Sequence, residues 1–246
     1  MGTIVEALSL PTWREYYRDH HVGIQERRRR REVNFFLNWF SARISRCPPS
    51  EADLSEKVSL WPGGDLTLLA CDAIVNAANT GLWAGGGICG AIFNAAGSSQ
   101  LKQACKAIDH CNTGESCITS GFNLPATFII HAVGPVSNNN LALARTYISA
   151  LNLAKRHRIR TIGFCCISTG IYGFPRHCAA MIALLTVRLW LTNPSNYNQI
   201  DRIVFSTYMK DDTSLYELLM PLAFACQLGK EENNSSSFES PNINES

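Results

Sequence analysis

The chain has 246 residues, of which 46% are hydrophobic and 17% charged, and its 22 basic and 20 acidic side chains leave a formal net charge of +2. This fits one globular domain with extensions, and the near-neutral balance disfavours a domain that binds nucleic acid directly, which needs a basic surface. No apolar run approaches the roughly 18 residues that span a bilayer, and the first residues do not resemble a secretory signal. We therefore expect an intracellular protein that does not enter a membrane.

The first 49 residues form a basic arm, with nine Arg against five Asp and Glu, and with five consecutive Arg from Arg27 to Arg31. Aromatic residues at Trp13, Tyr16 and Tyr17, and again between 35 and 40, predict one or two helices that pack on a domain and end at the prolines 48 and 49. The Arg run leaves three interpretations open: a solvated helix face, a nuclear-import or phosphate-binding patch, or a disordered segment. We expect a cytoplasmic or nuclear location, because the acidic residues of the arm disfavour a mitochondrial address.

After the arm, short apolar segments alternate with longer helical patterns. The predicted strands are 57–61, 72–78, 127–133, 161–168 and 201–208, and the predicted helices lie near 87–108, 140–157, 175–192 and 212–227. Strands that are apolar on both faces and separated by helices require a sheet that is covered on both sides. We therefore predict an α/β fold, a three-layer α/β/α sandwich with a mixed, largely parallel sheet.

The end of the chain is polar and acidic, and it is too poor in large apolar groups to offset its own ordering entropy. We predict that it is disordered. The chain then divides into a helical extension (1–53), a domain (54–229) and a tail (230–246).

The ten cysteines contain no CxxC pair and no evenly spaced framework, so we expect free thiols. Cys105, His110, Cys111 and Cys117 lack the paired spacing of a zinc site. We therefore expect neither a metal nor a cofactor.

A glycine-rich loop follows the second predicted strand, where Asn79 precedes Gly85–Gly87 and a predicted helix. Because glycine loses more backbone entropy on folding than other residues, three in a row suggest that something approaches the backbone closely; a plain flexible loop is the alternative. Exposed N–H groups at a helix start bind anions, above all phosphate. Neither a P-loop nor the GxGxxG dinucleotide motif fits the spacing.

A second small-residue loop, 168–175, leaves the fourth predicted strand and contains Ser168, Thr169, Gly170 and Gly173. In parallel sheets, ligands bind at the carboxyl ends of the strands, so two such loops could clamp a diphosphate between them. Charge-assisted hydrogen bonds to backbone N–H groups contribute roughly 1.5 to 3 kcal/mol each. A few therefore suffice for micromolar binding without any Lys or Arg.

Two further residues suggest recognition of a base. Asp65 follows two glycines and could accept a hydrogen bond from an exocyclic amine such as that of adenine, although such an Asp is more often a turn residue or helix cap. Tyr208 closes the last predicted strand, where its ring could stack on a base or belong to the core.

Together these segments resemble the macrodomain family, specifically its MacroD-type branch, over about residues 54–227. The motifs occur in the expected order: GDxT at 64–67, DAIVNAAN at 72–79, GGG at 85–87, AAG at 95–97, CxTGE at 111–115, FNLPA at 122–126, IIHAVGP at 129–135 and STGIYGFP at 168–175. The segment WREYYRD at 13–19 is similar to the helical extension of MacroD-type proteins. The resemblance implies that the protein binds ADP-ribose as a monomer, and that it hydrolyses ester-linked mono-ADP-ribose on Asp and Glu side chains and O-acetyl-ADP-ribose.

The resemblance also assigns roles to residues. Asp65 and the backbone at Leu66 would contact the adenine, and Tyr208 would contact the adenosine. The two loops would surround the diphosphate, with Tyr172 closing over it. Asn79 would position the distal ribose. The catalytic residues would be Asn79, Gly87 and Cys89. The full set of expected ligand contacts is Asp65, Leu66, Ala78, Asn79, Gly85, Gly86, Gly87, Ile88, Cys89, Ser168, Thr169, Gly170, Ile171, Tyr172, Gly173, Phe174 and Tyr208. Asn76 and Ala77 would shape their loop.

The sequence departs from the family at two positions, because MacroD-type hydrolases typically have Asp where Cys89 stands and His where Phe93 stands. Three interpretations remain. In the first, hydrolysis persists because a phosphate of the ligand activates the water. In the second, the protein is a reader, which binds ADP-ribose on modified proteins without turnover. In the third, the Cys89 thiol itself acts as a base or nucleophile. His131 on the third predicted strand is expected to be a buried, hydrogen-bonded strand residue without a catalytic role.

Overall fold

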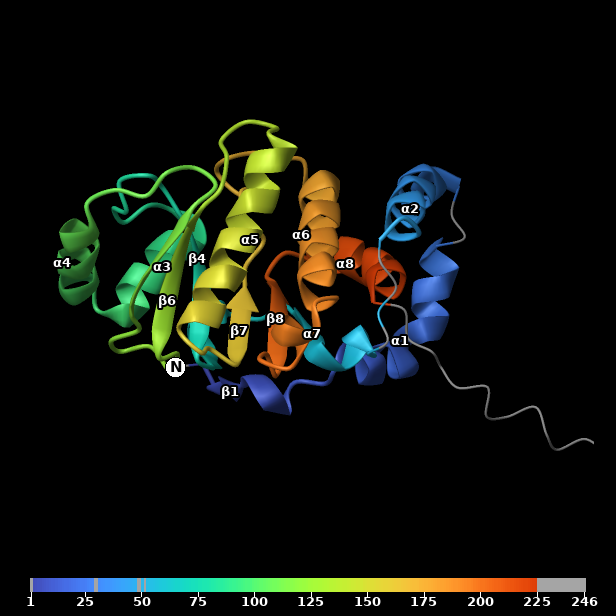
Figure 1. Ribbon diagram of the computed structural model, residues 1–246, viewed down its shortest axis with the longest axis horizontal. Coiled ribbons are helices and arrows are strands. Elements are labelled where there is room, and N and C mark those ends of the chain that lie inside the picture. The colour runs from blue at the N-terminus through green and yellow to red at the C-terminus, as the bar shows by residue number, and fades with distance from the viewer. Residues whose placement is uncertain (1, 29–30, 48–49, 51, 225–246) are drawn as a thin grey trace, which may run out of the picture.

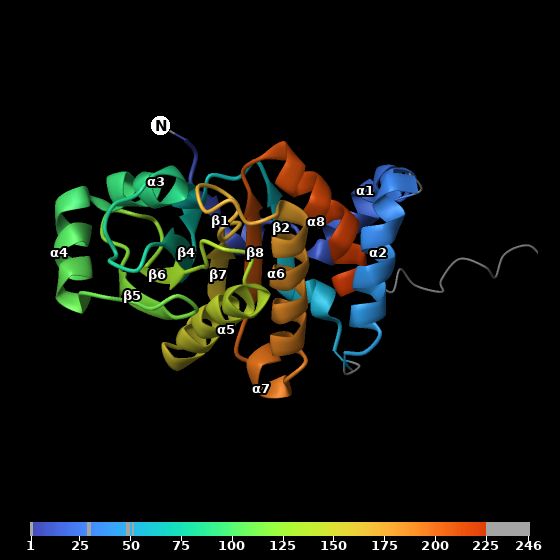
Figure 2. The same cartoon turned by 90° about the horizontal axis from the view of Figure 1, so that it is seen from above.

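The computed structural model describes residues 2–28, 31–47, 50 and 52–224. Its main sheet has the strand order β2-β8-β7-β4-β6-β5, seen from one of its helix-covered faces in Figure 1 and edge to edge in Figure 2. The strands are β2 (Val58–Pro62), β4 (Ala73–Ala78), β5 (Ser116–Ser120), β6 (Phe128–Val133), β7 (Thr161–Phe164) and β8 (Arg202–Thr207). All neighbours pair in parallel except β5, which runs antiparallel to β6 at the edge.

Helices cover both faces of this sheet. α5 (Asn140–Arg156), α6 (Arg176–Leu191) and α8 (Lys210–Ala223) pack on one face, and α3 (Gly87–Ala96) and α4 (Ser98–Ile108) pack on the other. Neighbouring strand residues alternate between the two cores, since Val75 and Phe205 belong to the first and Ile74 and Val204 to the second. The predicted three-layer α/β/α sandwich is confirmed.

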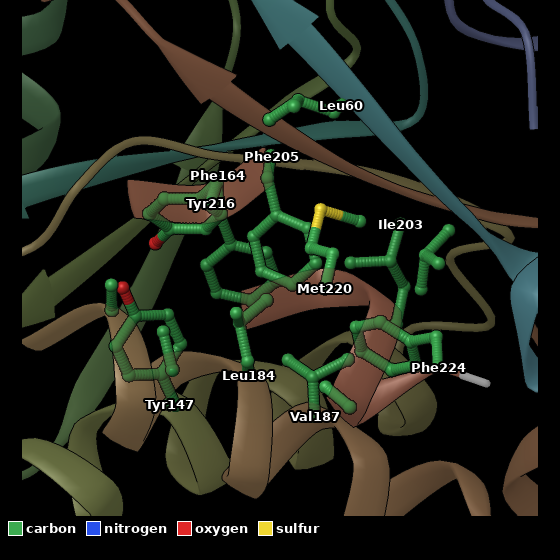
Figure 3. Packing of buried hydrophobic residues seen from close by; sticks show 14 of the residues in the cluster. Leu60, Tyr147, Phe164, Leu184, Val187, Ile203, Phe205, Tyr216, Met220 and Phe224 are labelled. Carbon is green, nitrogen blue, oxygen red and sulfur yellow. The ribbon is translucent and has the colours of Figure 1, made fainter. Parts of the chain in front are cut away.

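The larger core is rich in aromatic residues (Figure 3). The Phe205 ring lies 5.4 Å from the ring of Tyr216 on α8 and 6.4 Å from that of Phe164 on β7, measured between centroids. These contacts fix α8 against the last strands of the sheet. They thereby hold the loop that joins β8 to α8 at the carboxyl edge.

Three predicted elements need correction. The strand predicted to end at 168 ends at Phe164, and the helical pattern 87–108 is two helices, because Gly97 between α3 and α4 has φ +93°, outside the helical region. β5 was not predicted, since its sequence SCITS is short and lies at the sheet edge. Small elements complete the fold: β1 (Val5–Glu6), β3 (Leu69–Ala70), α7 (Pro194–Tyr197) and the 3₁₀ helices η1 (Ala7–Ser9), η2 (Leu54–Lys57) and η3 (Leu66–Leu68).

The predicted helices of the arm are present as α1 (Trp13–Arg28) and α2 (Arg31–Ile44), and both pack against α8 (Figure 2). Trp13 and Phe40 are fully buried in the larger core. The Arg27 guanidinium pairs with the Glu217 carboxylate of α8 at 2.6 Å. Arg29, Arg30, the two prolines and the predicted tail lie outside the described residues, so the tail and the division into extension, domain and tail stay predictions.

The described cysteines are all free thiols, as predicted. Within the described ranges, no helix is both long and apolar enough to cross a membrane, and no three His, Cys, Asp or Glu side chains gather in the way a metal ion requires.

Candidate functional site

A cavity of about 710 Å³ opens at the carboxyl edge of the sheet. Its walls are the loops that follow β2, β4, β7 and β8, so the strand order arranges the site in a line. Asp65 and Tyr208 lie at the β2–β8 end, the loop after β7 lies in the middle, and Asn79 and Cys89 lie at the β4 end. A long ligand would therefore meet three kinds of surface in sequence.

All but two of the predicted contact residues line the cavity; the exceptions are Gly173 and Phe174. The Phe174 side chain is buried in the larger core, and its N–H donates to the Ser168 carbonyl at 3.0 Å. Gly173 has φ +64° and donates its N–H to the Gly170 carbonyl at 2.9 Å. Phe174 therefore supports the loop from the core, and Gly173 forms an exposed turn, so neither residue is part of the cavity wall.

The glycines of the β4–α3 loop are explained by backbone geometry. Gly87 has φ +60°, a conformation that other residues rarely adopt, and α3 begins there, with its first turn lining the cavity. A Cβ on Gly90 would lie 2.7 Å from the Gly85 carbonyl oxygen, so the loop can fold onto α3 only with glycine at that position. The loop is therefore built for close approach to its backbone.

Asn79 holds the same loop closed. Its Nδ2 donates to the Trp83 carbonyl at 2.8 Å, and its Oδ1 accepts from the Trp83 N–H at 3.2 Å. The side chain is half-buried, and it still lines the cavity. Asn79 therefore fixes the position of the loop as well as facing the ligand space.

The Cys89 thiol is buried, with 4% of the residue exposed, and it closes the floor of the β4 end. Its Sγ accepts from the Gly85 N–H at 3.4 Å and from Asn76 Nδ2 at 3.7 Å. Asn76 itself is fully buried. These contacts tie the thiol into the loop and its supporting strand.

Behind Cys89 lies His131, which is fully buried on β6. Its Nδ1 lies 3.1 Å from Asn76 Nδ2, and its Nε2 lies 2.9 Å from Thr119 Oγ1. Burial lowers the pKa of His131 from 6.5 to about 4, so the ring is neutral at physiological pH. The expectation of a buried, hydrogen-bonded strand histidine is confirmed.

Ser168 carries two unusual features in the middle of the site. Its φ is +67°, which is rare outside glycine, and its buried Oγ has no hydrogen-bond partner within the described protein. A buried hydroxyl without a partner costs about 1 to 3 kcal/mol. Ser168 lines the cavity, but its Oγ lies against Gly134, so the side chain must rotate before a polar ligand atom can supply the missing partner.

At the β2–β8 end, Asp65 caps η3: its Oδ1 accepts from the Thr67 N–H at 3.0 Å and from Thr67 Oγ1 at 2.7 Å. Asp65 is thus a helix cap through this oxygen, which is the alternative that the sequence left open. Its side chain is nevertheless exposed and lines the cavity. The Tyr208 side chain is 74% exposed, so it is a wall residue rather than part of the core.

The Macro domain family model matches residues 75–183. A macro domain-containing protein of Ralstonia nicotianae is 50% identical over 158 residues, which are 62% of this chain and 88% of that protein. The chain belongs to the macrodomain family.

Solved macrodomains have the same fold. The macro domain of ganglioside induced differentiation associated protein 2 superposes with a TM-score of 0.74 at 32% identity, covering 93% of this chain and all of the other. A Trypanosoma brucei macrodomain, solved in complex with ADP-ribose, gives a TM-score of 0.64 at 41% identity, covering 69% of this chain and 71% of the other.

The chain is also similar to larger macrodomain proteins. ADP-ribose glycohydrolase MACROD2 of Homo sapiens is 45% identical over 185 residues, 73% of this chain and 43% of that protein. The chain therefore spans less than half the length of the MACROD2 relatives that it matches.

Several wall residues of this macrodomain were not predicted: Gly64, Ala77, Trp83, Ala91, Gly134, Cys165, Cys166, Ile167, Ser206, Met209 and Asp212. Asp212 is a buried carboxylate on α8 that pairs with Arg176 of α6 at 2.9 Å. The local sequence KDDTS does not predict that the second Asp is buried at the cavity wall. Trp83 was passed over as part of a small-residue loop.

The cavity wall offers few groups for proton transfer. No Lys, Arg or His is among the described residues that line it, and the acidic ones are Asp65 and Asp212, both on the β2–β8 side. Desolvation raises the pKa of Tyr172 and raises that of Cys165 to about 12, so both stay protonated at neutral pH. Phe93 is buried in the smaller core and does not line the cavity.

Proposed function

We propose that this macrodomain binds ADP-ribose and hydrolyses esters of it, namely mono-ADP-ribose on protein Asp and Glu side chains and O-acetyl-ADP-ribose. The supporting observation is the linear cavity, with Asp65 at one end, two glycine loops in the middle and Asn79 at the other end. The names of the MACROD relatives and the ADP-ribose complex of the Trypanosoma brucei macrodomain point in the same direction.

The adenine would lie at the β2–β8 end. Asp65 Oδ1 is engaged by Thr67, so the second carboxylate oxygen, Oδ2, would accept from the exocyclic amine. The exposed ring of Tyr208 would cover the adenosine. With its two carboxylate oxygens used separately, Asp65 would cap η3 and contact the base at the same time.

The diphosphate would lie between the two loops, each of which precedes a helix. The first-turn N–H groups of α3 face the cavity, and the loop before α6 adds the Ser168 hydroxyl. A phosphate oxygen would accept a hydrogen bond from Ser168 Oγ and remove the cost of its burial. Backbone and hydroxyl donors would thus replace the absent basic side chains in this part of the described wall.

The distal ribose would then reach Asn79 and the floor formed by Cys89. A water positioned there would attack at or near the distal ribose and break the ester bond, which releases ADP-ribose and the carboxylic acid. A ligand phosphate would accept the proton of the water and return it to the departing oxygen, because no carboxylate or imidazole of the described wall lies at this end. Asn79 would orient the ribose. The contacts of Cys89 with Gly85 and Asn76 favour a packing role for the thiol over nucleophilic attack.

A reader without turnover is the second candidate. The observation that favours it is the same lack of a protein base at the β4 end, since losing a general base lowers rates by roughly 10² to 10⁴ while leaving binding contacts in place. Reader and hydrolase share every binding feature of the cavity. Turnover alone separates them.

Asp65→Asn tests the adenine end. The Asn Oδ1 can keep the hydrogen bonds from Thr67, whereas its amide group cannot accept from the adenine amine, so we expect ADP-ribose affinity to fall by about 1.5 to 3 kcal/mol. Calorimetry with ADP-ribose measures the loss, and thermal unfolding checks that the cap survives. Unchanged affinity would refute the adenine assignment.

Asn79→Ala tests the reaction end. We expect release of ADP-ribose from a protein modified on Glu to slow more than ADP-ribose affinity declines, because orientation of the ribose matters most in the transition state. Single-turnover rates and calorimetry on the same preparation give the two numbers. Equal losses in both would mean that Asn79 only binds.

A further inference from the structure

Trp83 presents a large apolar surface at the reaction end of the cavity. The residue is 63% exposed and lines the cavity. Its ring rests on Gly81, because a Cβ on Gly81 would lie 1.8 Å from Trp83 Cζ3. An exposed indole on the wall of a binding cavity is a contact surface for ligands, because it offers a large apolar area at a low cost in conformational entropy.

The backbone of Trp83 is fixed relative to the proposed ribose site. Asn79 holds both its N–H and its carbonyl, and the Cys89 Sγ lies 3.7 Å from that carbonyl. The residue thus shares one end of the cavity with the two side chains assigned to the distal ribose. A group attached to a ribose bound at Asn79 would therefore lie near the indole.

The other exposed apolar residues of the wall lie elsewhere. Ile171 is 78% exposed, but its Cδ1 would lie 2.8 Å from a Cβ on Gly86, so it covers the phosphate loops. Tyr208 and Met209 are at the β2–β8 end. Tyr172, which also lines the cavity, is less exposed and belongs to the loop after β7, so Trp83 is the exposed aromatic group at the β4 end among the described wall residues.

We propose that Trp83 is a specificity-determining residue that binds the acyl group esterified to the distal ribose and favours acyl chains longer than acetyl. This inference rests on the proposed function, because it requires ADP-ribose in the cavity with its distal ribose at Asn79. A methylene that packs on one face of the indole is partly removed from water, which strengthens binding by about two- to threefold for each methylene.

Binding is measured first, without turnover, by calorimetry with ADP-ribose and its non-hydrolysable acetamido, propionamido and butyramido analogues at the distal ribose. We expect the wild type to bind the butyramido analogue about fivefold more tightly than the acetamido analogue. Trp83→Ala should remove this preference, with each affinity taken relative to that of the same variant for ADP-ribose, while Trp83→Phe should keep most of it. Trp39→Ala, at an exposed tryptophan on α2, is the matched control and should keep it fully.

The results separate the inference from the proposed function. If the wild type does not bind ADP-ribose, both fail. If ADP-ribose binds but affinity does not rise with acyl length, or if the rise survives in Trp83→Ala, the inference alone is overturned.

The two sources of an acyl group are distinguished by turnover of O-butyryl-ADP-ribose and of a peptide that carries ADP-ribose on Glu. If Trp83→Ala slows turnover of O-butyryl-ADP-ribose alone, the indole binds the acyl group of small-molecule esters. If it slows turnover of the peptide, the indole binds the acyl group of modified proteins. Either supports the inference, and unchanged rates with both substrates contradict it.

Discussion

Single side chains of the site serve the fold and the ligand together. Asp65 caps η3 with one oxygen, Asn79 clamps the loop through Trp83, and Ser168 keeps a strained backbone with an unpartnered hydroxyl. A residue whose hydrogen bonds are partly used inside the protein is held in place before the ligand arrives. Binding then costs little ordering of these groups.

Burial of the neutral His131 ring makes the stability of the protein depend on pH. Its pKa is about 4 in the folded protein and about 6.5 when unfolded, so the unfolded chain binds a proton first as the pH falls. Stability should therefore fall from pH 6.5 down to 4, by about 2 kcal/mol between pH 7.5 and 5 from this group alone.

Urea unfolding of the wild type and of His131→Gln at both pH values measures this contribution. The variant cannot titrate at this position, so it should lose about 2 kcal/mol less than the wild type over the same interval. An identical loss in both proteins would show that the buried ring does not set the acid sensitivity.

At the scale of elements, the helical extension is part of the main core. Trp13 on α1 is fully buried in the same cluster as the strands β2, β7 and β8. Glu217 of α8 accepts from Tyr16 Oη at 2.7 Å and pairs with Arg27, so two residues of α1 meet one carboxylate. The extension thereby stabilises α8, which begins at the cavity with Asp212.

Trp13→Ala should lower the free energy of unfolding by about 3 to 5 kcal/mol, the usual cost of removing a buried aromatic ring. Trp39→Ala is the matched control, because Trp39 is 42% exposed, and its effect should stay within about 0.5 kcal/mol. Denaturant unfolding measures both. A small and equal effect would mean that α1 does not contribute to the core.

The sequence predicted elements well where hydrophobic pattern and packing agree, as in the strands around Val75 and Ile130. It missed β5, which is short, lies at the sheet edge and mixes polar with apolar residues. It also missed the break between α3 and α4, because the helical pattern continues across Gly97. At the site, it found the small-residue loops, since their geometry demands glycine. It missed Asp212 and Trp83, because only the tertiary structure brings them to the cavity.

For the whole molecule, the order of parallel strands sets the order of chemistry. The loops after β2 and β8, after β7 and after β4 succeed one another along one edge, and the proposed function places the base, the diphosphate and the distal ribose in this order. At the two positions where the resemblance implies groups that transfer a proton, this chain has a buried thiol, Cys89, and a core phenylalanine, Phe93. The account therefore rests on whether this cavity hydrolyses what it binds.

The direct test is release of labelled ADP-ribose from a protein mono-ADP-ribosylated on Glu, by the wild type beside Cys89→Asp, with ADP-ribose affinity measured for both. We predict that the wild type releases the label, which would show that no side-chain base is required at position 89 and would leave activation of the water to the ligand phosphate. Tight ADP-ribose binding by the wild type without release, together with release by Cys89→Asp, would contradict hydrolysis and make the protein a reader.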